Sequence, residues 1–378
     1  MKLRNNIWWR VMLKRSPSMK LEILAANNVS RVDSLLGREN ISSRHSGLEL
    51  LRLVAMYFIL ALHVNFYAYG VPSVLDFRLS PVGSFTRVFI ESFTIVGVNS
   101  FILISGWFGI RPKFKRIAEL LFQCVFFCCV LYGVGFVAGM TFELKDVVKN
   151  IFLVGKLNWF IKAYLGLYVL SPVLESFAES SSKRVFSSVL VSFFAFQTLY
   201  GWIFPVAVFI SGGYSTFSFI GLYLLARYIR RFSPGFSRLS QRQDIMIYCL
   251  LSLCTAVFSS TTMHIKGVML CNWFFYCSPL VIASALFLFL CFAKMGFCNS
   301  AIDALARSSY AVYLLHIHPC FYASFLAFVT THLLGSLCNV SLIPVFLAVV
   351  FALSILLDRI RIYIWKRIYM ACSQKVLQ

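Results

Sequence analysis

The stretch LELLRLVAMYFILALHVNFYAY, residues 48–69, decides the fold class of this chain. It is almost entirely apolar, and it is long enough to cross a bilayer as one helix, which takes roughly 20 residues. It nevertheless contains Arg52 and His63. Ionisable side chains inside hydrocarbon cost free energy, so they usually mark a functional site or a water-filled cavity.

The spacing of Arg52 and His63 places both side chains on one face of the expected helix. Eleven steps at ~100° each give about 1100°, which lies within ~20° of a whole number of turns. The rise of ~1.5 Å per residue separates the two positions by about 16 Å along the axis. One helix face therefore carries a cation near one membrane surface and an imidazole deep in the membrane.

The composition extends this conclusion to the whole chain. The 378 residues are 60% hydrophobic and 13% charged, whereas about 25% of the residues in a soluble domain are charged. The mean hydropathy is +0.80. Strand alternation is absent, which argues against a β-barrel. We therefore expect an all-α polytopic membrane protein with one transmembrane domain, residues 48–365.

We expect about ten membrane-spanning helices with both chain ends in the cytoplasm. The apolar segments run approximately over residues 48–69, 85–108, 117–140, 157–177, 185–204, 206–226, 245–263, 271–293, 309–330 and 340–364. In this topology the inside loops and tails hold 27 Lys and Arg residues, and the outside loops hold six. Cytoplasmic loops are enriched in Lys and Arg, so the asymmetry supports the assignment.

The same topology accounts for the net charge of +21, which on a soluble protein would suggest nucleic acid. No nucleic-acid-binding motif accompanies the charge, so we expect no nucleic-acid partner. We expect residues 1–47 to form a basic, poorly ordered cytoplasmic tail and residues 366–378 to form a second cytoplasmic tail. The cysteines lie mostly in apolar segments without a CxxC pair, so we expect neither a disulfide framework nor a metal site.

Four motifs in order resemble the membrane-bound acyltransferase 3 family. They are ELLRLVAMYFILALH at residues 49–63, VNSFILISGW at 98–107, NWFIKAYLGLY at 158–168 followed by Ser171-Pro172, and SYAVYLLH at 309–316. The first resembles the family pattern of an acid, an Arg and a His. The basic loop 111–116 departs from the compact R-x-x-R pair that many members carry. Arg227 and Arg230 match that pair by letter but follow the sixth segment, so the role is not transferred to them. With no fused hydrolase-like domain after residue 365, we expect a stand-alone form.

The resemblance implies an enzyme of the bacterial inner membrane. Such an enzyme transfers an acyl group, usually acetyl from acetyl-CoA, to a hydroxyl of a cell-surface or lipid-linked glycan. Acyl-CoA is the donor, and no cofactor is bound permanently. The expected catalytic residues are His63 as general base, with Glu49 and Arg52. Phosphates of coenzyme A demand cations on the cytoplasmic side. The residues expected to supply them are Arg52, Arg111, Lys113, Lys115 and Arg116.

Each candidate also has a structural interpretation. Glu49 and Arg52 form an i, i+3 pair that neutralises itself, and His63 can be a neutral imidazole bonded between helices. The candidates for substrate contact are Trp159, Lys162, Tyr164, Ser309, Tyr313 and His316. Interfacial aromatic belts and helix packing explain several of these equally well. Lys162 is expected to be buried and to meet Glu175 or substrate.

Two other functions remain open from the sequence. The chain could be a carrier, flippase or accessory export protein for a lipid-linked sugar, or it could transfer succinyl instead of acetyl. A transporter should show broken helices in matched halves, and only Ser211-Gly212-Gly213 suggests such a break. Ser105-Gly106 is expected to permit close helix packing and not to serve as a nucleophile.

Overall fold

The computed structural model describes residues 45–155, 158–334 and 337–375. Most of the expected N-terminal tail and the last three residues lie outside these ranges, so the division into tails and domain stays a prediction. Every regular element of the described residues is a helix, and none of them is a strand. This confirms the all-α fold class.

Within the described residues, each of the ten apolar segments is helical, and shorter helices lie between them. The helices of the first half, long and short together, are α3 (Ser46–Leu62) with the π-helix η1 (His63–Ala68), α4 (Val74–Leu79), α5 (Pro81–Thr94), α6 (Gly97–Phe108), α7 (Phe114–Val137), α8 (Leu144–Ile151) and α9 (Trp159–Ser180). In the second half they are α10 (Lys183–Gln197), η3 (Thr198–Ile203), η4 (Ser211–Gly213), α11 (Thr216–Phe232), η5 (Gly235–Arg238), α12 (Gln241–Lys266), η6 (Cys271–Phe274), α13 (Pro279–Ala293), α14 (Ser300–Ala306), α15 (Ser309–His316), α16 (Pro319–Phe328), η7 (Val329–Leu333), α17 (Leu337–Val340) and α18 (Ile343–Lys375).

Helix length and composition give fewer membrane crossings than the ten expected. In the described chain, eight helices are long and apolar enough to cross a membrane, or nine if the bent pair 300–316 and 319–333 is one span. α11 has 17 residues, fewer than the roughly 20 that a crossing takes. The polytopic architecture is therefore established, while the count of ten and the cytoplasmic location of both ends stay predictions.

Two of the expected segments differ from straight helices for identifiable reasons. The ninth bends by 84° between His316 and Pro319. His318 is extended (φ −63°, ψ 138°) because the residue before a proline is disfavoured in the α region. The sixth begins at Thr216, not near residue 206, because Ser211, Gly212 and Gly213 all have positive φ and cannot continue a helix.

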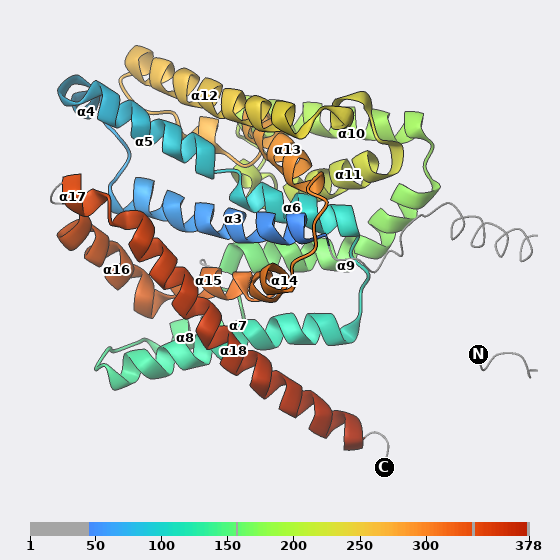
Figure 1. The fold of residues 1–378 in the computed structure, drawn as a ribbon, viewed down its shortest axis with the longest axis vertical. Helices are drawn as coiled ribbons and strands as arrows, with labels where there is room; N and C mark the ends of the chain where they lie inside the picture. Colours follow the sequence, from blue (N-terminus) through green and yellow to red (C-terminus); the bar gives the residue numbers. More distant parts are fainter. Residues whose placement is uncertain (1–44, 156–157, 335–336, 376–378) are drawn as a thin grey trace, which may run out of the picture. The chain divides into compact units, whose positions relative to one another are not determined.

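Helix α3 is central in the helix arrangement of the described residues, where it contacts α5, α6, α13, α14, α15 and α18 (Figure 1). It runs antiparallel to α6, because the Phe108 ring lies 6.5 Å from His45 while Gly97 lies against the Ala55 carbonyl. A Cβ at Gly97 would stand 2.7 Å from that oxygen, which no side chain tolerates. The loop that follows α6 is therefore placed beside the first turn of α3.

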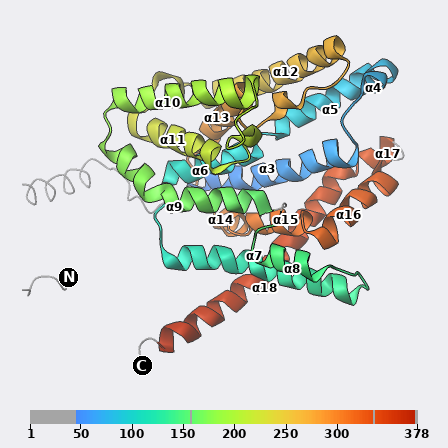
Figure 2. The same ribbon diagram turned by 180° about the vertical axis from the view of Figure 1, so that it is seen from behind.

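The Ser105-Gly106 motif has the packing role that the sequence indicated. A Cβ at Gly106 would lie 2.5 Å from the Tyr223 carbonyl oxygen on α11, so only glycine permits this approach. The Ser105 hydroxyl donates to the Phe101 carbonyl within its own helix. Figure 2 shows α10 and α11 on one side of α3 and α6, and α18 on the other side. Helix α11 packs on both α6 and α9.

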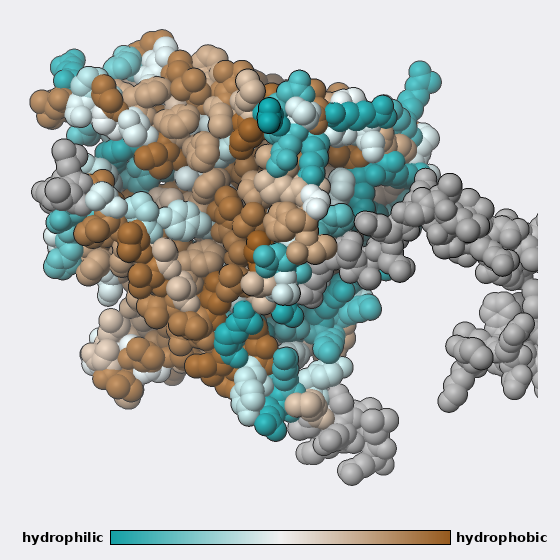
Figure 3. All heavy atoms as spheres, in the orientation of Figure 1, coloured by the Kyte–Doolittle hydropathy of each residue, from teal (hydrophilic) through white to brown (hydrophobic). Residues whose placement is uncertain are grey.

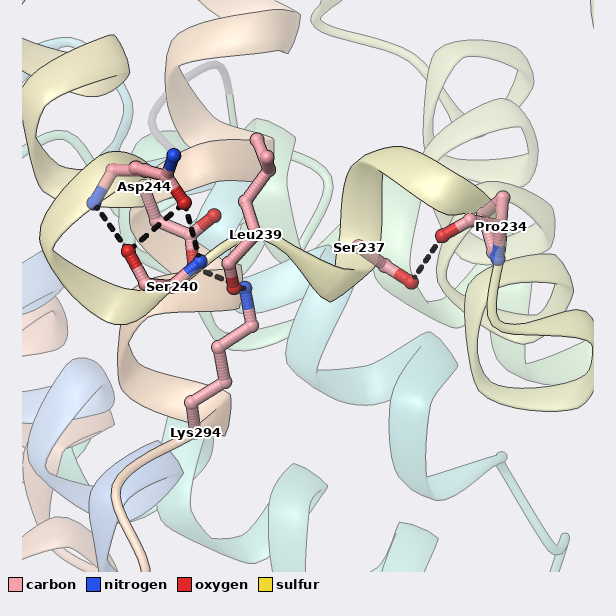
Figure 4. A network of polar contacts seen from close by, with 7 residues as sticks. Pro234, Ser237, Leu239, Ser240, Asp244 and Lys294 are labelled. Carbon is pink, nitrogen blue, oxygen red and sulfur yellow. Dashed lines mark hydrogen bonds and ion pairs between the residues drawn. The ribbon is translucent and has the colours of Figure 1, made fainter.

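Polar clusters join helices at two places away from the centre. At the start of α12, Lys294 donates to the Leu239 carbonyl and to the buried Asp244 carboxylate (Figure 4). Between α7 and α18, the buried Asp358 carboxylate accepts from Arg361 and from Gln123 at 2.9 Å. Pairing of this kind offsets the cost of burying a charge.

The outer surface has the distribution that a bilayer requires. Apolar side chains cover much of the face crossed by α18, and hydrophilic side chains gather toward the helix ends (Figure 3). Large apolar residues on this outer surface are exposed by half or more, among them Val345, Leu353 and Leu356. Apolar surface of this extent on a soluble protein would be unstable in water, whereas hydrocarbon covers it without cost.

Candidate active site

The first turns of α3 carry a self-neutralising pair. Arg52 Nη1 lies 3.2 Å from Glu49 Oε2, so the i, i+3 ion pair that the sequence indicated is present. The Arg52 side chain is still 30% exposed, which leaves donors of its guanidinium accessible. Ser46 fixes the start of the helix: its hydroxyl donates to the Asp303 carboxylate at 2.8 Å and accepts from the backbone N–H of Asn299.

His63 begins the π-helical turn η1 that ends the first span. π-Helical turns are rare and occur often at functional sites, because the extra residue redirects the side chains that follow. On η1 the amide of Asn65 donates to the Arg87 carbonyl at 2.8 Å and to Glu91 at 3.0 Å. The irregular turn is therefore held by α5, and His63 is presented from a fixed backbone.

His63 is bonded to a second imidazole from the other end of the sequence. His63 Nδ1 lies 3.1 Å from His316 Nε2, and His316 Nδ1 lies 2.7 Å from the Val312 carbonyl oxygen. A carbonyl only accepts, so Nδ1 of His316 carries the proton and Nε2 of the neutral ring accepts. His63 then donates from Nδ1, and its ring also interacts with the Ile59 carbonyl one turn earlier. Within the described residues its Nε2 has no hydrogen-bond partner, so the lone pair of this nitrogen is available.

A cavity of about 570 Å³ opens beside His63. Its wall is mostly aromatic and apolar, with a few polar groups. The lining residues are Ile59, Leu62, His63, Phe66, Tyr67, Val71, Glu91, Ile95, Val98, Trp159, Tyr214, Cys271, Phe274, Phe275, Tyr276, Tyr313, Ile317 and Tyr322. An apolar pocket with few convergent polar groups is the usual form of a small-molecule site.

On the loop after η1, Ser73 donates two hydrogen bonds to Asp76, which lower the pKa of this carboxyl and keep it ionised in the cap of α4.

The structure brings together only some of the predicted substrate residues. Trp159 and Tyr313 line the cavity with His63. Tyr164 and Ser309 do not line it: Tyr164 stacks on Phe160, and Ser309 is buried in the packing of α15. His316 is fully buried behind His63, so it contacts the imidazole and not the cavity.

The expected burial of Lys162 and its expected contact with Glu175 were wrong. Its side chain is exposed, and its Nζ donates to the Gly155 carbonyl at 3.3 Å. Glu175 is not its partner; this carboxylate pairs with Arg227 at 2.8 Å near the other end of α9. The hydropathy of the segment concealed the fact that Lys162 lies only three residues from the helix start, where a lysine reaches the membrane surface.

Basic side chains gather at the end of α3 that carries Arg52. The predicted residues Arg111, Lys113, Lys115 and Arg116 are exposed there, between α6 and α7. Sequence reasoning did not use Arg227 and Arg230 on α11, which join them around Glu175: Arg230 donates to the Trp107 carbonyl and lies within electrostatic range of Arg111. Their R-x-x-R spacing was the signal that could have identified them.

Glu91 is the cavity residue that sequence reasoning missed altogether. It is 3% exposed and lies inside the second apolar segment. The criterion that singled out Arg52 and His63, an ionisable residue within a span, applies equally to Glu91.

A family model described as an acyltransferase domain matches residues 45–359, which is most of the chain and contains all four motifs. The chain belongs to the acyltransferase 3 family. It is therefore a multi-pass membrane protein of the acyltransferase type. No curated protein and no solved structure matches the chain.

Proposed function

We propose that this acyltransferase moves an acetyl group from acyl-CoA to a hydroxyl of a cell-surface or lipid-linked glycan in the bacterial inner membrane. The observation that carries the proposal is the His316–His63 pair, which leaves His63 Nε2 as an acceptor beside a 570 Å³ cavity. A base with a free lone pair and room for a substrate beside it is the minimum that acyl transfer to a hydroxyl requires.

In the proposed reaction, the acceptor hydroxyl donates to His63 Nε2. As its oxygen attacks the thioester carbonyl, His63 takes the proton; the C–O bond forms, and the C–S bond breaks when the tetrahedral intermediate collapses. The proton on Nε2 then passes to the departing thiolate of coenzyme A. His316 fixes which nitrogen of His63 is basic, and it stabilises the imidazolium because its Nε2 accepts from Nδ1–H throughout.

The donor would bind through its phosphates at the opposite end of α3. Arg52 and the exposed basic residues after α6 lie at that end, together with Arg227 and Arg230. The axial distance from Arg52 to His63 is about 16 Å. This matches the reach of a pantetheine arm, whose roughly thirteen bonds extend to on the order of 15 Å at ~1.2 Å each. A thioester held at Arg52 thus presents its carbonyl near His63.

The carrier alternative has one observation in its favour. The pair α15 and α16 is bent by 84°, and broken helices are typical of transporter binding sites. The bend lies directly after His316, however, so it also serves to place this imidazole against η1. The two functions differ in whether acyl-CoA is consumed.

The test is turnover of radiolabelled acetyl-CoA by the full chain purified in detergent. We expect the wild type to cleave the thioester or to label an acceptor, and His63→Ala to lose at least about 100-fold of this activity. His264→Ala is the matched control, because His264 is exposed and lies outside the cavity. Normal turnover by folded His63→Ala would refute the role of the base. A folded wild type that neither binds nor cleaves acetyl-CoA would favour the carrier.

A further inference from the structure

Glu91 is a buried carboxylate whose only hydrogen-bond partner within the described residues is a neutral amide. Its Oε2 accepts from Asn65 Nδ2 at 3.0 Å, and its side chain forms no ion pair in that part of the chain. The neighbouring Arg87 directs its guanidinium elsewhere: it donates to the Asn65 and Gly70 carbonyls and lies 3.8 Å from the centre of the Tyr69 ring. A carboxylate accepts about four hydrogen bonds, so most of its capacity is unused.

Glu91 lines the same cavity as His63. Tyr67 connects the two groups: its ring centre lies 5.2 Å from that of His63, and its hydroxyl is within electrostatic range of Glu91. A ligand seated against Tyr67 can therefore reach both the base and the carboxylate. A buried carboxyl group with unused hydrogen-bonding capacity costs free energy, and a ligand that hydrogen-bonds to it removes that cost.

Much of the rest of the cavity wall is aromatic. Trp159 stacks on Tyr276 with ring centres 5.8 Å apart and planes at 22°, and Tyr214 packs against both rings at 4.6 and 4.8 Å. Such rings offer flat apolar faces with a polar rim. The faces suit the C–H side of a pyranose, whereas its hydroxyls need an acceptor such as a carboxylate.

We infer that Glu91 binds the acceptor, accepting a hydrogen bond from a sugar hydroxyl adjacent to the one that is acylated at His63. The inference rests on the proposed transfer to a sugar hydroxyl, and it adds a specificity-determining residue and a neutral pyranose as the ligand class. Asn65 holds the carboxylate in place from η1, the same π-helical turn that presents His63. The base and the acceptor-binding carboxylate are thus positioned by one irregular backbone segment.

The test compares wild type, Glu91→Gln and Glu179→Gln in detergent. The amide oxygen of the substituted glutamine can still accept from Asn65, so Glu91→Gln keeps the shape and replaces the second carboxyl oxygen by an NH₂ group that only donates. Glu179 is exposed on α9 and serves as the matched control. Transfer from radiolabelled acetyl-CoA is measured with n-octyl hexopyranosides as acceptors, and then with singly deoxygenated forms of the best acceptor. The rate of acetyl-CoA hydrolysis without acceptor is measured in parallel.

We expect Glu91→Gln to raise KM for the glycoside about five- to 150-fold, the effect of leaving one buried hydrogen-bonding group without its partner, about 1–3 kcal/mol. Hydrolysis and KM for acetyl-CoA should change less than about twofold, because the donor site lies at the other end of α3. One deoxy acceptor should react poorly with wild type, and this discrimination should vanish in Glu91→Gln.

Several results would overturn the inference. Glycoside kinetics unchanged by Glu91→Gln would do so, as would equal losses for both substrates, which indicate a structural role. A wild type that hydrolyses acetyl-CoA through His63 but acylates no glycoside would exclude the sugar while the proposed base stands. A preference for the 2-amino glycoside that is lost in Glu91→Gln would assign an ammonium ligand instead. Failure of acetyl-CoA turnover in wild type would refute the proposed function itself, and with it this inference.

Discussion

Replacing His316 by Phe isolates the contribution of the second imidazole. His316 is fully buried, and its neighbours Tyr313 and Phe325 are aromatic rings 5.9 and 6.1 Å away, so the pocket accommodates a phenyl ring. The substitution removes only the acceptor of the His63 Nδ1–H bond and the local bond to Val312. His63 keeps its place on η1, and the Ile59 carbonyl one turn earlier is the partner that remains for its ring within the described residues.

The magnitude follows from the lost hydrogen bond. A buried donor that loses its partner costs about 1–3 kcal/mol, toward the lower end here because the Ile59 carbonyl stays close to the ring. His63 escapes this cost by moving its proton to Nε2 or by turning its ring, and either change takes the lone pair out of the cavity. Restoring the reactive form then adds about 1–3 kcal/mol to the barrier. Since about 1.4 kcal/mol is a factor of ten, kcat should fall about 5- to 150-fold.

The assay is acetyl-CoA turnover by the purified full chain, with kcat and KM determined separately and folding checked by thermal unfolding in detergent. KM for acetyl-CoA should change by less than about twofold, because Arg52 is distant. His316→Gln provides the rescue, since its amide oxygen can accept from Nδ1–H and should restore part of kcat. An unchanged kcat in His316→Phe, or His316→Gln no better than His316→Phe, would refute the assigned tautomer.

Three further predictions concern the donor end and the packing. Arg52→Ala should raise KM for acetyl-CoA at least about tenfold through the loss of a phosphate contact, with kcat nearly unchanged; an unaltered KM would show that Arg52 only neutralises its neighbour. Gly106→Val should prevent stable folding, measured as loss of a monodisperse peak in detergent, because its Cβ would meet the Tyr223 carbonyl at 2.5 Å; a normal melting temperature would contradict this packing. Glu175→Gln should destabilise the protein by about 2 kcal/mol in thermal unfolding, because Arg227 loses its 2.8 Å partner in a partly buried site; no shift would mean that solvent replaces the pair.

The sequence by itself determined the fold class, the apolar segments and the first half of the site. Apolar segments of bilayer length leave helices as the structure, because backbone groups in hydrocarbon must bond within their own segment. The face shared by Arg52 and His63 also follows from local geometry, since both lie on one helix and its early continuation. The same holds for Gly106, whose lack of a side chain indicates close packing wherever it falls.

Only the tertiary structure decided what surrounds His63. His316 lies 253 residues away in sequence, and its contact with His63 depends on the bend before Pro319 and on the packing of α15 against α3. Glu91 reaches the cavity through the register of α5 against the π-helical turn, which no periodicity predicts. Lys162 shows the reverse: hydropathy placed it inside the membrane, whereas the helix boundary puts it at the surface. Helical periodicity specifies a face within one segment, but side-chain packing between segments determines which faces meet.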